Sequence, residues 1–216
     1  MSARRIYHFN DEAEREIDPG TNRTVRRLER LRTALERRQT DLHLVLENVH
    51  DPHNVSAVLR TCDAIGIDTV HLVYSEGKFP RLSKASSTGA LKWLELISHN
   101  SIDDCYRQLR QEGCAIISTY LGPDTRDLYA IDYRLPTAIV FGNENKGISE
   151  EAMKGSDATI SIPMVGLVTS LNISVACAVT LYEAFRQRRA AGLYDHPTMT
   201  PEAIDQRLVE WAERKS

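Results

Sequence analysis

Long apolar runs, cysteine pairs and nucleotide-binding loops are all missing from this sequence of 216 residues. The longest apolar stretch, Leu171 to Leu181, is broken by polar residues, whereas a membrane span needs about 20 mostly apolar ones. The first residues are charged and lead into no apolar segment, so we expect no secretory signal and no membrane partner. The four cysteines stand far apart without a CxxC pair, which predicts reduced thiols and a cytoplasmic location.

Motifs that hold nucleotides or metals are absent as well. Neither GxGxxG nor the P-loop pattern occurs, so nothing indicates a dinucleotide or a nucleoside triphosphate. His50 and His53 stand three residues apart, but no further Cys/His cluster accompanies them, and Pro52 interrupts the helix that would align them. We therefore predict no metal site.

Charge is nearly balanced overall, at a formal −3, but it is unevenly distributed. Residues 23–38 contain no lysine, two glutamates and seven arginines: Arg23, Arg26, Arg27, Arg30, Arg32, Arg37 and Arg38. Such an excess is typical of a phosphate-binding surface, because the guanidinium group matches the oxygens of a phosphate. A solvated helix face with partial i,i+4 pairing would carry the same charges, so both interpretations stay open.

Short apolar runs alternate with helical patterns through the body of the chain. The apolar runs predict buried strands over 42–46, 69–73, 114–119, 137–141 and 158–162. Helical spacing covers 22–38, 54–65, 102–111, 149–154 and 170–191; Gly192 ends the last of these, and Thr200-Pro201 opens a final helix.

This alternation predicts an α/β domain with a mostly parallel sheet flanked by helices. We place that domain over 41–192. Residues 1–40 form an arginine-rich N-terminal extension that we expect to bind RNA, and the first 20 of them show no clean period, as expected of a loosely ordered arm. Residues 193–216 form a short C-terminal helical extension.

Three polar segments stand where predicted strands meet predicted helices. In the first, Asn54 lies at the start of a helix, where it can cap the helix or hold a neighbour. Arg60 projects away from the apolar stripe of the same helix. Each fits an ordinary surface residue, but together they indicate a site at the carboxyl end of a parallel strand.

The second segment places Glu144 in a turn between Gly142 and Gly147, where glycine lets the backbone approach a ligand closely. Glu144 is either a site carboxylate or a plain turn residue. The third segment passes through an apolar loop to Ser170 and Asn172. That loop suits a ligand with apolar and polar parts, or the surface of a subunit partner.

Taken together, the three segments resemble the motifs of the SPOUT class of methyltransferases, and most closely its TrmH branch of tRNA guanosine 2′-O-methyltransferases. The first motif matches Asn54 to Arg60, the second matches 141–149 and the third matches 162–176. The order and spacing of all three make the resemblance specific, and it extends from about Asp41 to Pro197.

This resemblance implies a deep trefoil knot near the C-terminus of the catalytic domain and a homodimer that packs through the knotted region. It implies S-adenosyl-L-methionine as cofactor and tRNA, not DNA, as partner. The implied catalytic residues are Asn54, Arg60, Glu144, Ser170 and Asn172. The implied cofactor-binding residues are Thr119, Leu121, Phe141, Gly142, Asn143, Glu144, Ile162, Met164, Ser170 and Leu171.

The reaction asks for a specific kind of help. A methyl group on a sulfonium is already activated, so the enzyme chiefly positions and deprotonates the ribose hydroxyl. The family assigns this task to the arginine at position 60, but a guanidinium is normally always protonated. We expect Arg60 to hold an RNA phosphate and stabilise the developing alkoxide, while phosphate or water takes the proton. We expect Asn54 to orient Arg60, Ser170 and Asn172 to shape the third segment, and Glu144 to hold the cofactor loop or the arginine.

The D-loop guanosine at position 18 of tRNA is the substrate that the resemblance favours. The alternative is a ribosomal-RNA 2′-O-methyltransferase, although those relatives often carry a larger N-terminal RNA-binding domain. A third interpretation is an RNA-binding factor without catalysis, against which the intact motifs argue.

Overall fold

Seven parallel strands form the centre of the structure, a computed structural model that describes residues 16–75, 77–80 and 89–214. Their order across the sheet is β5-β4-β3-β8-β6-β9-β7. In chain order they are β3 (Leu42–Glu47), β4 (Thr69–Val73), β5 (Glu95–His99), β6 (Ala115–Thr119), β7 (Arg126–Asp127), β8 (Thr137–Phe141) and β9 (Ala158–Ser161). All five predicted strands lie in this sheet, whereas β5 and the short edge strand β7 were not predicted.

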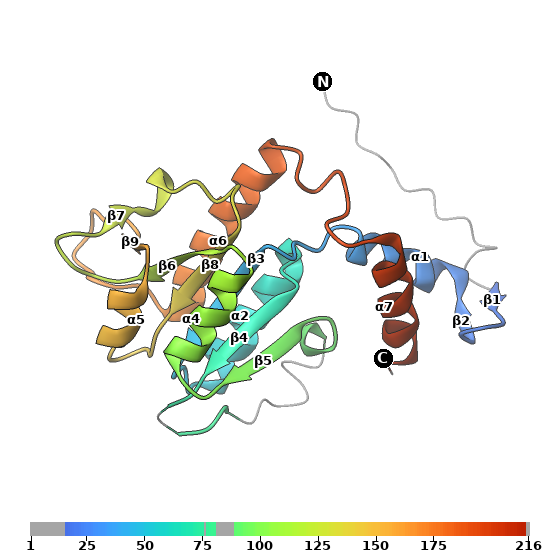
Figure 1. Cartoon of the computed structure of the whole chain (residues 1–216), viewed down its shortest axis with the longest axis horizontal. Coiled ribbons are helices and arrows are strands. Elements are labelled where there is room, and N and C mark those ends of the chain that lie inside the picture. Colours follow the sequence, from blue (N-terminus) through green and yellow to red (C-terminus); the bar gives the residue numbers. More distant parts are fainter. Residues whose placement is uncertain (1–15, 76, 81–88, 215–216) are drawn as a thin grey trace.

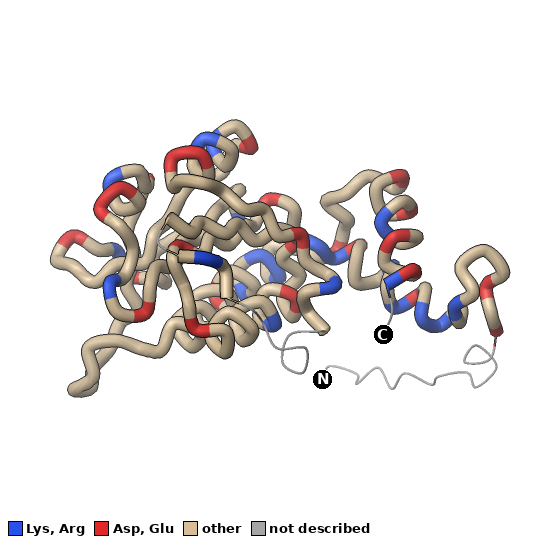
Figure 2. Tube along the Cα trace, turned by 90° about the horizontal axis from the view of Figure 1, so that it is seen from below, with Lys and Arg blue, Asp and Glu red and all other residues tan. Residues whose placement is uncertain are grey.

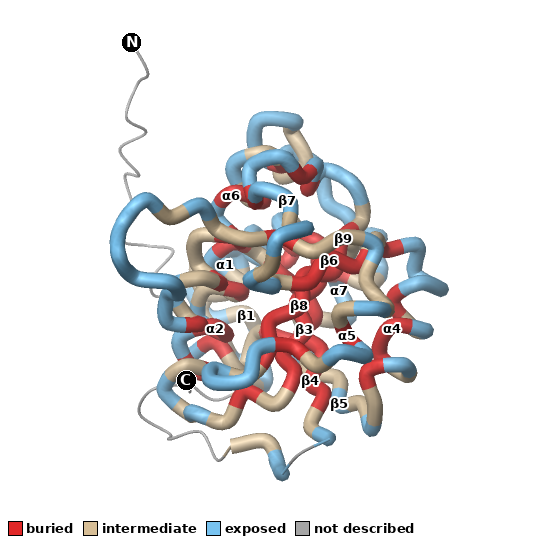
Figure 3. Tube along the Cα trace, turned by 90° about the vertical axis from the view of Figure 1, so that its left-hand side faces the viewer, coloured by how far each residue is buried: buried red, intermediate tan, exposed pale blue. Residues whose placement is uncertain are grey.

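Helices cover both faces of the sheet (Figure 1). One face packs against α2 (Pro52–Ile65) and α6 (Ile173–Ala190), and the other against α4 (Ile102–Gln111) and α5 (Glu150–Gly155). Successive side chains of a strand point to opposite faces, so Leu44 enters the first core and Val45 the second. Figure 3 shows the central strands as the buried middle of the molecule. The predicted α/β architecture with a parallel sheet is confirmed.

Capping residues decide where two of the site helices begin. Asp51 caps α2 by accepting a hydrogen bond from the backbone N–H of His53 at 2.8 Å, and Pro52 takes the first helical position. Asn54 is therefore inside the helix, and the predicted start at position 54 was wrong by two residues. Asn172 caps α6 by accepting from the N–H of Ser174 at 2.8 Å, which moves the start from the predicted 170 to 173.

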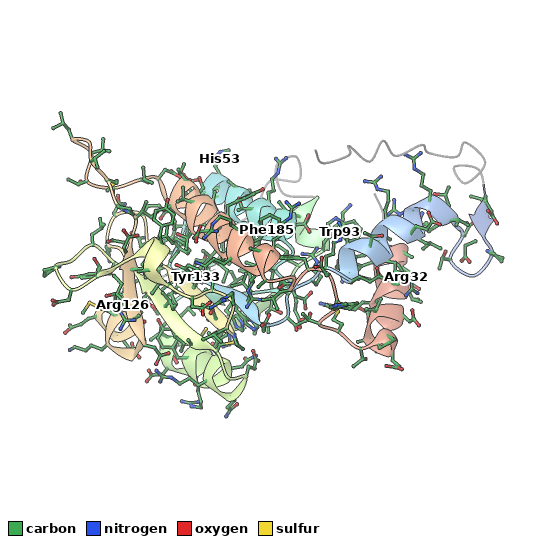
Figure 4. The ribbon with its side chains drawn as sticks, turned by 90° about the horizontal axis from the view of Figure 1, so that it is seen from above. Arg32, His53, Trp93, Arg126, Tyr133 and Phe185 are labelled. Carbon is green, nitrogen blue, oxygen red and sulfur yellow. The ribbon has the colours of Figure 1, made fainter. Side chains whose placement is uncertain are left out.

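The two predicted terminal extensions pack on one another beside the domain (Figure 1). α1 (Val25–Leu35) and α7 (Pro201–Glu213) share a small apolar core of Leu35, Ile204 and Trp211. Trp93, which follows the short 3₁₀ helix η1 (Ala90–Lys92), contacts Trp211 with ring centroids 5.0 Å apart, and Figure 4 shows it at the junction. Thr200 caps α7 as predicted. The domain boundaries themselves stay a prediction.

The remaining described segments are short. A hairpin of β1 (Ile17–Asp18) and β2 (Arg23–Thr24) precedes α1, and a second 3₁₀ helix, η2 (Leu128–Ala130), follows β7. Residues 1–15 of the predicted arm lie outside the described residues. α1 is shorter than predicted at its N-terminal end because Thr24 caps it. In the described chain no helix has the length and apolarity to cross a membrane.

Candidate active site

A cavity of about 380 Å³ lies beyond the carboxyl ends of β6, β8 and β9. Parallel sheets of this kind place ligand sites at that edge. The cavity is lined by every residue predicted to bind the cofactor: Thr119, Leu121, Phe141, Gly142, Asn143, Glu144, Ile162, Met164, Ser170 and Leu171. Three loops that are far apart in the sequence thus meet around one hollow.

Several lining residues were not predicted. They include Tyr120, Asn145, Lys146, Ser161 and Thr180. Tyr120, Asn145, Lys146 and Ser161 stand next to predicted residues in the same loops, so taking each loop as a continuous lining would have found them. Thr180, two turns into α6, carries no local signal of this kind. Lys146 adds a cation to the turn that also carries Glu144.

The turn 142–147 is built by close backbone packing. A Cβ atom on Gly142 would lie 2.2 Å from the carbonyl carbon and oxygen of Gly147, so only glycine fits. The side-chain oxygen of Asn143 accepts from the N–H groups of residues 145 and 146, and its Nδ2 donates to the carbonyl of Asn48 at 2.8 Å. Buried Glu47 accepts from the N–H of Ser149 at 2.8 Å. The turn is therefore fastened to the end of β3 on both sides.

Asn54 joins the three predicted motifs. Its Nδ2 donates to Oε1 of Glu144 at 3.3 Å, and its Oδ1 accepts from Nδ2 of Asn172 at 3.0 Å. The Oδ1 of Asn172 also accepts from the hydroxyl of Ser174 at 2.6 Å. An amide suits this position because it donates on one side and accepts on the other. The Glu144 carboxylate at the edge of the cavity is thus held by a residue of α2, which is itself hydrogen-bonded to the N-cap of α6.

Arg60 lies two turns further along α2, exposed, and makes no hydrogen bond or ion pair with another described residue. The hydrogen bonds of Asn54 go to Glu144 and Asn172. That Asn54 orients Arg60 stays a prediction. Ser170, by contrast, is exposed in the loop that lines the cavity.

Tyr74 lies close enough to Glu144 to interact with it electrostatically. Its hydroxyl donates to the carbonyl of Val49 at 2.6 Å. Burial, and then the negative charge of Glu144, raise the pKa of Tyr74 well above its ordinary value. The phenol therefore stays protonated at neutral pH, and Tyr74 is a structural support rather than a base. The ring of His50 stands edge-on to it, with centroids 5.6 Å apart.

The seven arginines of residues 23–38 differ in burial: some are buried or bonded to other parts of the chain, and others are exposed. Arg38 is 2% exposed: it donates to the carbonyl of Ile67 at 2.6 Å, pairs with Asp63 at 2.5 Å and lies over the ring of Trp211. It supports the fold, and its predicted role in RNA binding does not fit this placement.

Three other arginines, one in β2 and two in α1, contact α7 or the residue that follows it. Arg23 Nε donates to the carbonyl of Ala212 at 2.7 Å, and Arg27 donates to the carbonyl of residue 214 at 3.2 Å. Arg32 pairs with Asp205 of α7 at 2.5 Å (Figure 4 labels Arg32), but both side chains are exposed. Arg30 and Arg37 are exposed and Arg26 is partly exposed. Figure 2 shows the basic positions gathered along α1.

Comparisons with known proteins show the family to which this chain belongs. Residues 41–182 match the SpoU rRNA Methylase family. A tRNA (guanosine(18)-2'-O)-methyltransferase of Thermus thermophilus is 47% identical over 189 residues, which are 88% of this chain and 97% of that one. The chain belongs to the SpoU methylase family.

Two solved members of the SpoU family extend the comparison. The crystal structure of the A. aeolicus TrmH/SpoU tRNA modifying enzyme has a TM-score of 0.82 and 38% identity, covering 87% of this chain and 95% of that one. The AviRb SpoU methyltransferase of Streptomyces viridochromogenes, solved in complex with AdoMet, has a TM-score of 0.62 and 28% identity, covering 72% and 62%. The predicted resemblance is confirmed, while the trefoil knot stays a prediction.

Proposed function

We propose that this SpoU family member transfers a methyl group from S-adenosylmethionine to the ribose 2′-hydroxyl of guanosine 18 in tRNA. The observation that carries the proposal is the cavity, which gathers all ten predicted cofactor positions beside the Asn54–Glu144–Asn172 cluster. The relative that is 47% identical is named for this activity, and the match covers 97% of its length. The choice of tRNA over rRNA rests on such relatives.

The residues that line the cavity suit the chemistry of the proposed cofactor. Leu121, Phe141 and Leu171 supply apolar surface for a flat base, and Glu144 and Ser170 supply polar groups at the rim. Because Gly142 has no Cβ, the turn stays close-packed, and residues of this turn line the cavity. When bound, S-adenosylmethionine supplies a methyl group on a sulfonium, which is activated for transfer without further help.

The chain's own residues then have two tasks, to position the ribose and to manage its proton. We assign Glu144 to the rim, where Asn54 holds it in one orientation. We assign Arg60 to the RNA phosphate and to the developing alkoxide, because its guanidinium is exposed and unpaired among the described residues. Phosphate or water accepts the proton. We assign Ser170 and Asn172 to shaping the loop that lines the cavity.

Arg60→Lys tests this role directly. It keeps the charge and loses the planar fork, so turnover should fall at least tenfold while cofactor affinity is unchanged. Arg107→Lys on α4 is the matched control, since Arg107 is also exposed and distant in the chain from the motifs. Near-full turnover of Arg60→Lys would show that the role assigned to Arg60 is wrong.

The proposed RNA surface is the outer side of α1. Arg26 and Arg30 are one turn apart and Arg37 lies just past the helix end. Arg26/Arg30/Arg37→Ala should lower the dependence of log affinity on log salt concentration by about 2 to 3, because each phosphate that an arginine neutralises adds roughly 0.7–0.9 to that slope. The control is Arg107/Arg134/Arg186→Ala, which removes three exposed arginines that each pair with a neighbouring acid. An unchanged salt slope in the first variant would refute the surface.

We also propose a homodimer that packs through the apolar loop and α6. Val165 and Leu167 are fully exposed and Val168 is 65% exposed, and Figure 4 shows the segment between β9 and α6 standing away from the domain. Val175 and Tyr182 of α6 are exposed as well. Water-exposed apolar surface of this extent usually marks an interface. Sedimentation at micromolar concentration should give the mass of two chains. Val168→Asp should lower that mass toward the mass of one chain.

A cytoplasmic location stays part of the proposal. Its support is that all four cysteines are free and buried, as expected of a protein kept in a reducing compartment. The proposed tRNA substrate is found in the cytoplasm as well.

The proposed reaction is tested with two versions of one tRNA, identical except that the second carries 2′-deoxyguanosine at position 18. Incubation with methyl-labelled S-adenosylmethionine should label only the first. Label in the deoxy version would overturn the ribose hydroxyl as acceptor. Label in rRNA but not in tRNA would favour the alternative substrate, and no label in either RNA would revive the non-catalytic interpretation.

A further inference from the structure

Three histidines form a row across strands β3, β4 and β5, on the face covered by α4. His71 lies opposite Val45 in the register, two residues beyond His43, and His99 lies opposite Val73, two residues beyond His71. Nδ1 of His71 is 2.8 Å from Nε2 of His99, and Nε2 of His71 is 3.2 Å from Nδ1 of His43. None of the three lines the cofactor cavity.

Two further side chains approach this row from α4 and its C-terminal end. The Sγ of Cys105, which is fully buried, lies with the ring nitrogens of His71 and His99 within 4.8 Å of one another. Oε2 of Glu112 is 3.5 Å from Nε2 of His43. These are ligand atoms that zinc prefers, namely imidazole nitrogen and thiolate sulfur, with a carboxylate further out.

We propose that His71, His99 and Cys105 form a binding site for a thiophilic divalent cation, with zinc as its natural class of ligand. The two imidazoles and the sulfur provide three ligands, and the partly exposed His99 leaves the fourth position on the solvent side for water. A zinc–nitrogen distance of about 2.0–2.1 Å needs the two nitrogens to separate to roughly 3.3 Å, a shift of about half an ångström in side chains.

His43 and Glu112 complete the site as positioning residues. A histidine that binds zinc usually donates its other ring N–H to an oriented acceptor, which fixes the ring and makes it a better ligand. Here His71 would donate from Nε2 to Nδ1 of His43, and His43 would donate from Nε2 to the Glu112 carboxylate. This series of hydrogen bonds leaves Nδ1 of His71 with a free lone pair that points at His99.

The protons balance. Without the ion, Nδ1 of His71 accepts a hydrogen bond from Nε2–H of His99. On binding, the proton of His99 moves to its Nδ1, so that Nε2 becomes a ligand, and the thiol of Cys105 releases one proton to solvent. The ion would connect α4 to β4 and β5, on the side of the sheet that the proposed methyl transfer does not use.

Cobalt(II) provides the test, because it substitutes for zinc and a thiolate ligand gives it a sulfur-to-metal charge-transfer band. Tag-free protein should take up one equivalent of cobalt(II) with that band, and zinc should displace it. Cys105→Ala should abolish the band and weaken binding at least 100-fold. His99→Gln, at a partly exposed position, should weaken it similarly, and His43→Gln about 10- to 100-fold.

Cys114→Ala and His53→Gln are the matched controls, a buried cysteine of the same core and an exposed histidine. Both should bind cobalt like the original protein, and circular dichroism shows whether each variant is folded. Absence of stoichiometric uptake at micromolar cobalt would overturn the proposal. So would a charge-transfer band that survives in folded Cys105→Ala or in folded His99→Gln.

Discussion

Replacing Gly142 by alanine tests whether close packing of the turn 142–147 is needed for cofactor binding. The new Cβ would lie 2.2 Å from the carbonyl carbon and oxygen of Gly147 and from the nitrogen of Ile148. All three are backbone atoms, so no side-chain rotation relieves the clash. Restoring an ordinary separation moves one side of the turn by about 1 Å.

A displacement of that size in a preorganised site costs about 100-fold in reaction rate, and we expect a loss of the same order in affinity where the displaced groups hold the cofactor. We therefore expect Gly142→Ala to weaken binding of S-adenosylmethionine by roughly 100-fold, which corresponds to about 2.7 kcal/mol. Isothermal titration with the cofactor or its demethylated product measures the affinity without RNA. Thermal unfolding of the same sample reports the accompanying loss of stability, about 1–3 kcal/mol for an overpacked position.

Two other glycines supply the controls. Gly147 and Gly113 have φ of +71° and +79°, and a Cβ on either would meet nothing within 4 Å. Alanine at each should cost about 1–2 kcal/mol of stability through the left-handed backbone alone. Gly113→Ala, remote from the cavity lining, should leave cofactor affinity unchanged. If Gly142→Ala bound the cofactor as tightly as Gly113→Ala does, the steric reasoning would be refuted.

Three further substitutions have definite expected outcomes. Asn54→Asp places a second carboxylate about 3.3 Å from Glu144, a repulsion of about 1 kcal/mol in water and about 5 kcal/mol at an effective dielectric constant of 20; kcat/KM should fall at least tenfold, further than in Asn54→Ala. Arg188→Met leaves Asp41 and two carbonyls without their buried partner, so urea denaturation should show a loss of about 3–5 kcal/mol, and a loss below 1 kcal/mol would contradict this. Hydrogen bonds from an arginine and a glutamine on the next turn lower the pKa of Glu183 below 4.5. The ionised Glu183 carboxylate therefore stabilises the fold above pH 4.5, and this stabilisation is lost as pH falls through the lowered pKa. Glu183→Gln should be less stable than the original protein at pH 7 and equally stable near pH 2.

The central strands could be predicted because strands buried on both faces are nearly continuous apolar runs. β3, β4 and β8 are fully buried and were predicted almost to the residue. β5 lies at the sheet edge, where no residue is fully buried and polar residues interrupt the apolar ones, and it was missed. The start of α2 was misplaced although its signal is local, since Asp51-Pro52 is a cap followed by a proline at the first helical position.

Tertiary context decided what the sequence left open. Arg38 belongs to the same charge run as Arg37, but only the fold shows that Arg38 is buried against Trp211. The histidine row depends on the register of three strands, which no spacing along the chain reveals. The spacing of His50 and His53 is visible in the sequence, whereas the neighbours of His71 are not. Among the described residues, neither member of that pair belongs to a group that could hold a metal.

The packing of α1 on α7 has a consequence for how the protein is made. The hydrogen bond from Arg23 to Ala212 spans 189 residues, which a ribosome adds in roughly 10–40 s at 5–20 residues per second. During that time the apolar side of α1, with Leu31 and Leu35, has no α7 to cover it. The nascent arginine-rich helix would lack its contacts with α7 until the catalytic domain has emerged. The proposed RNA-binding surface would therefore form only after the proposed active site.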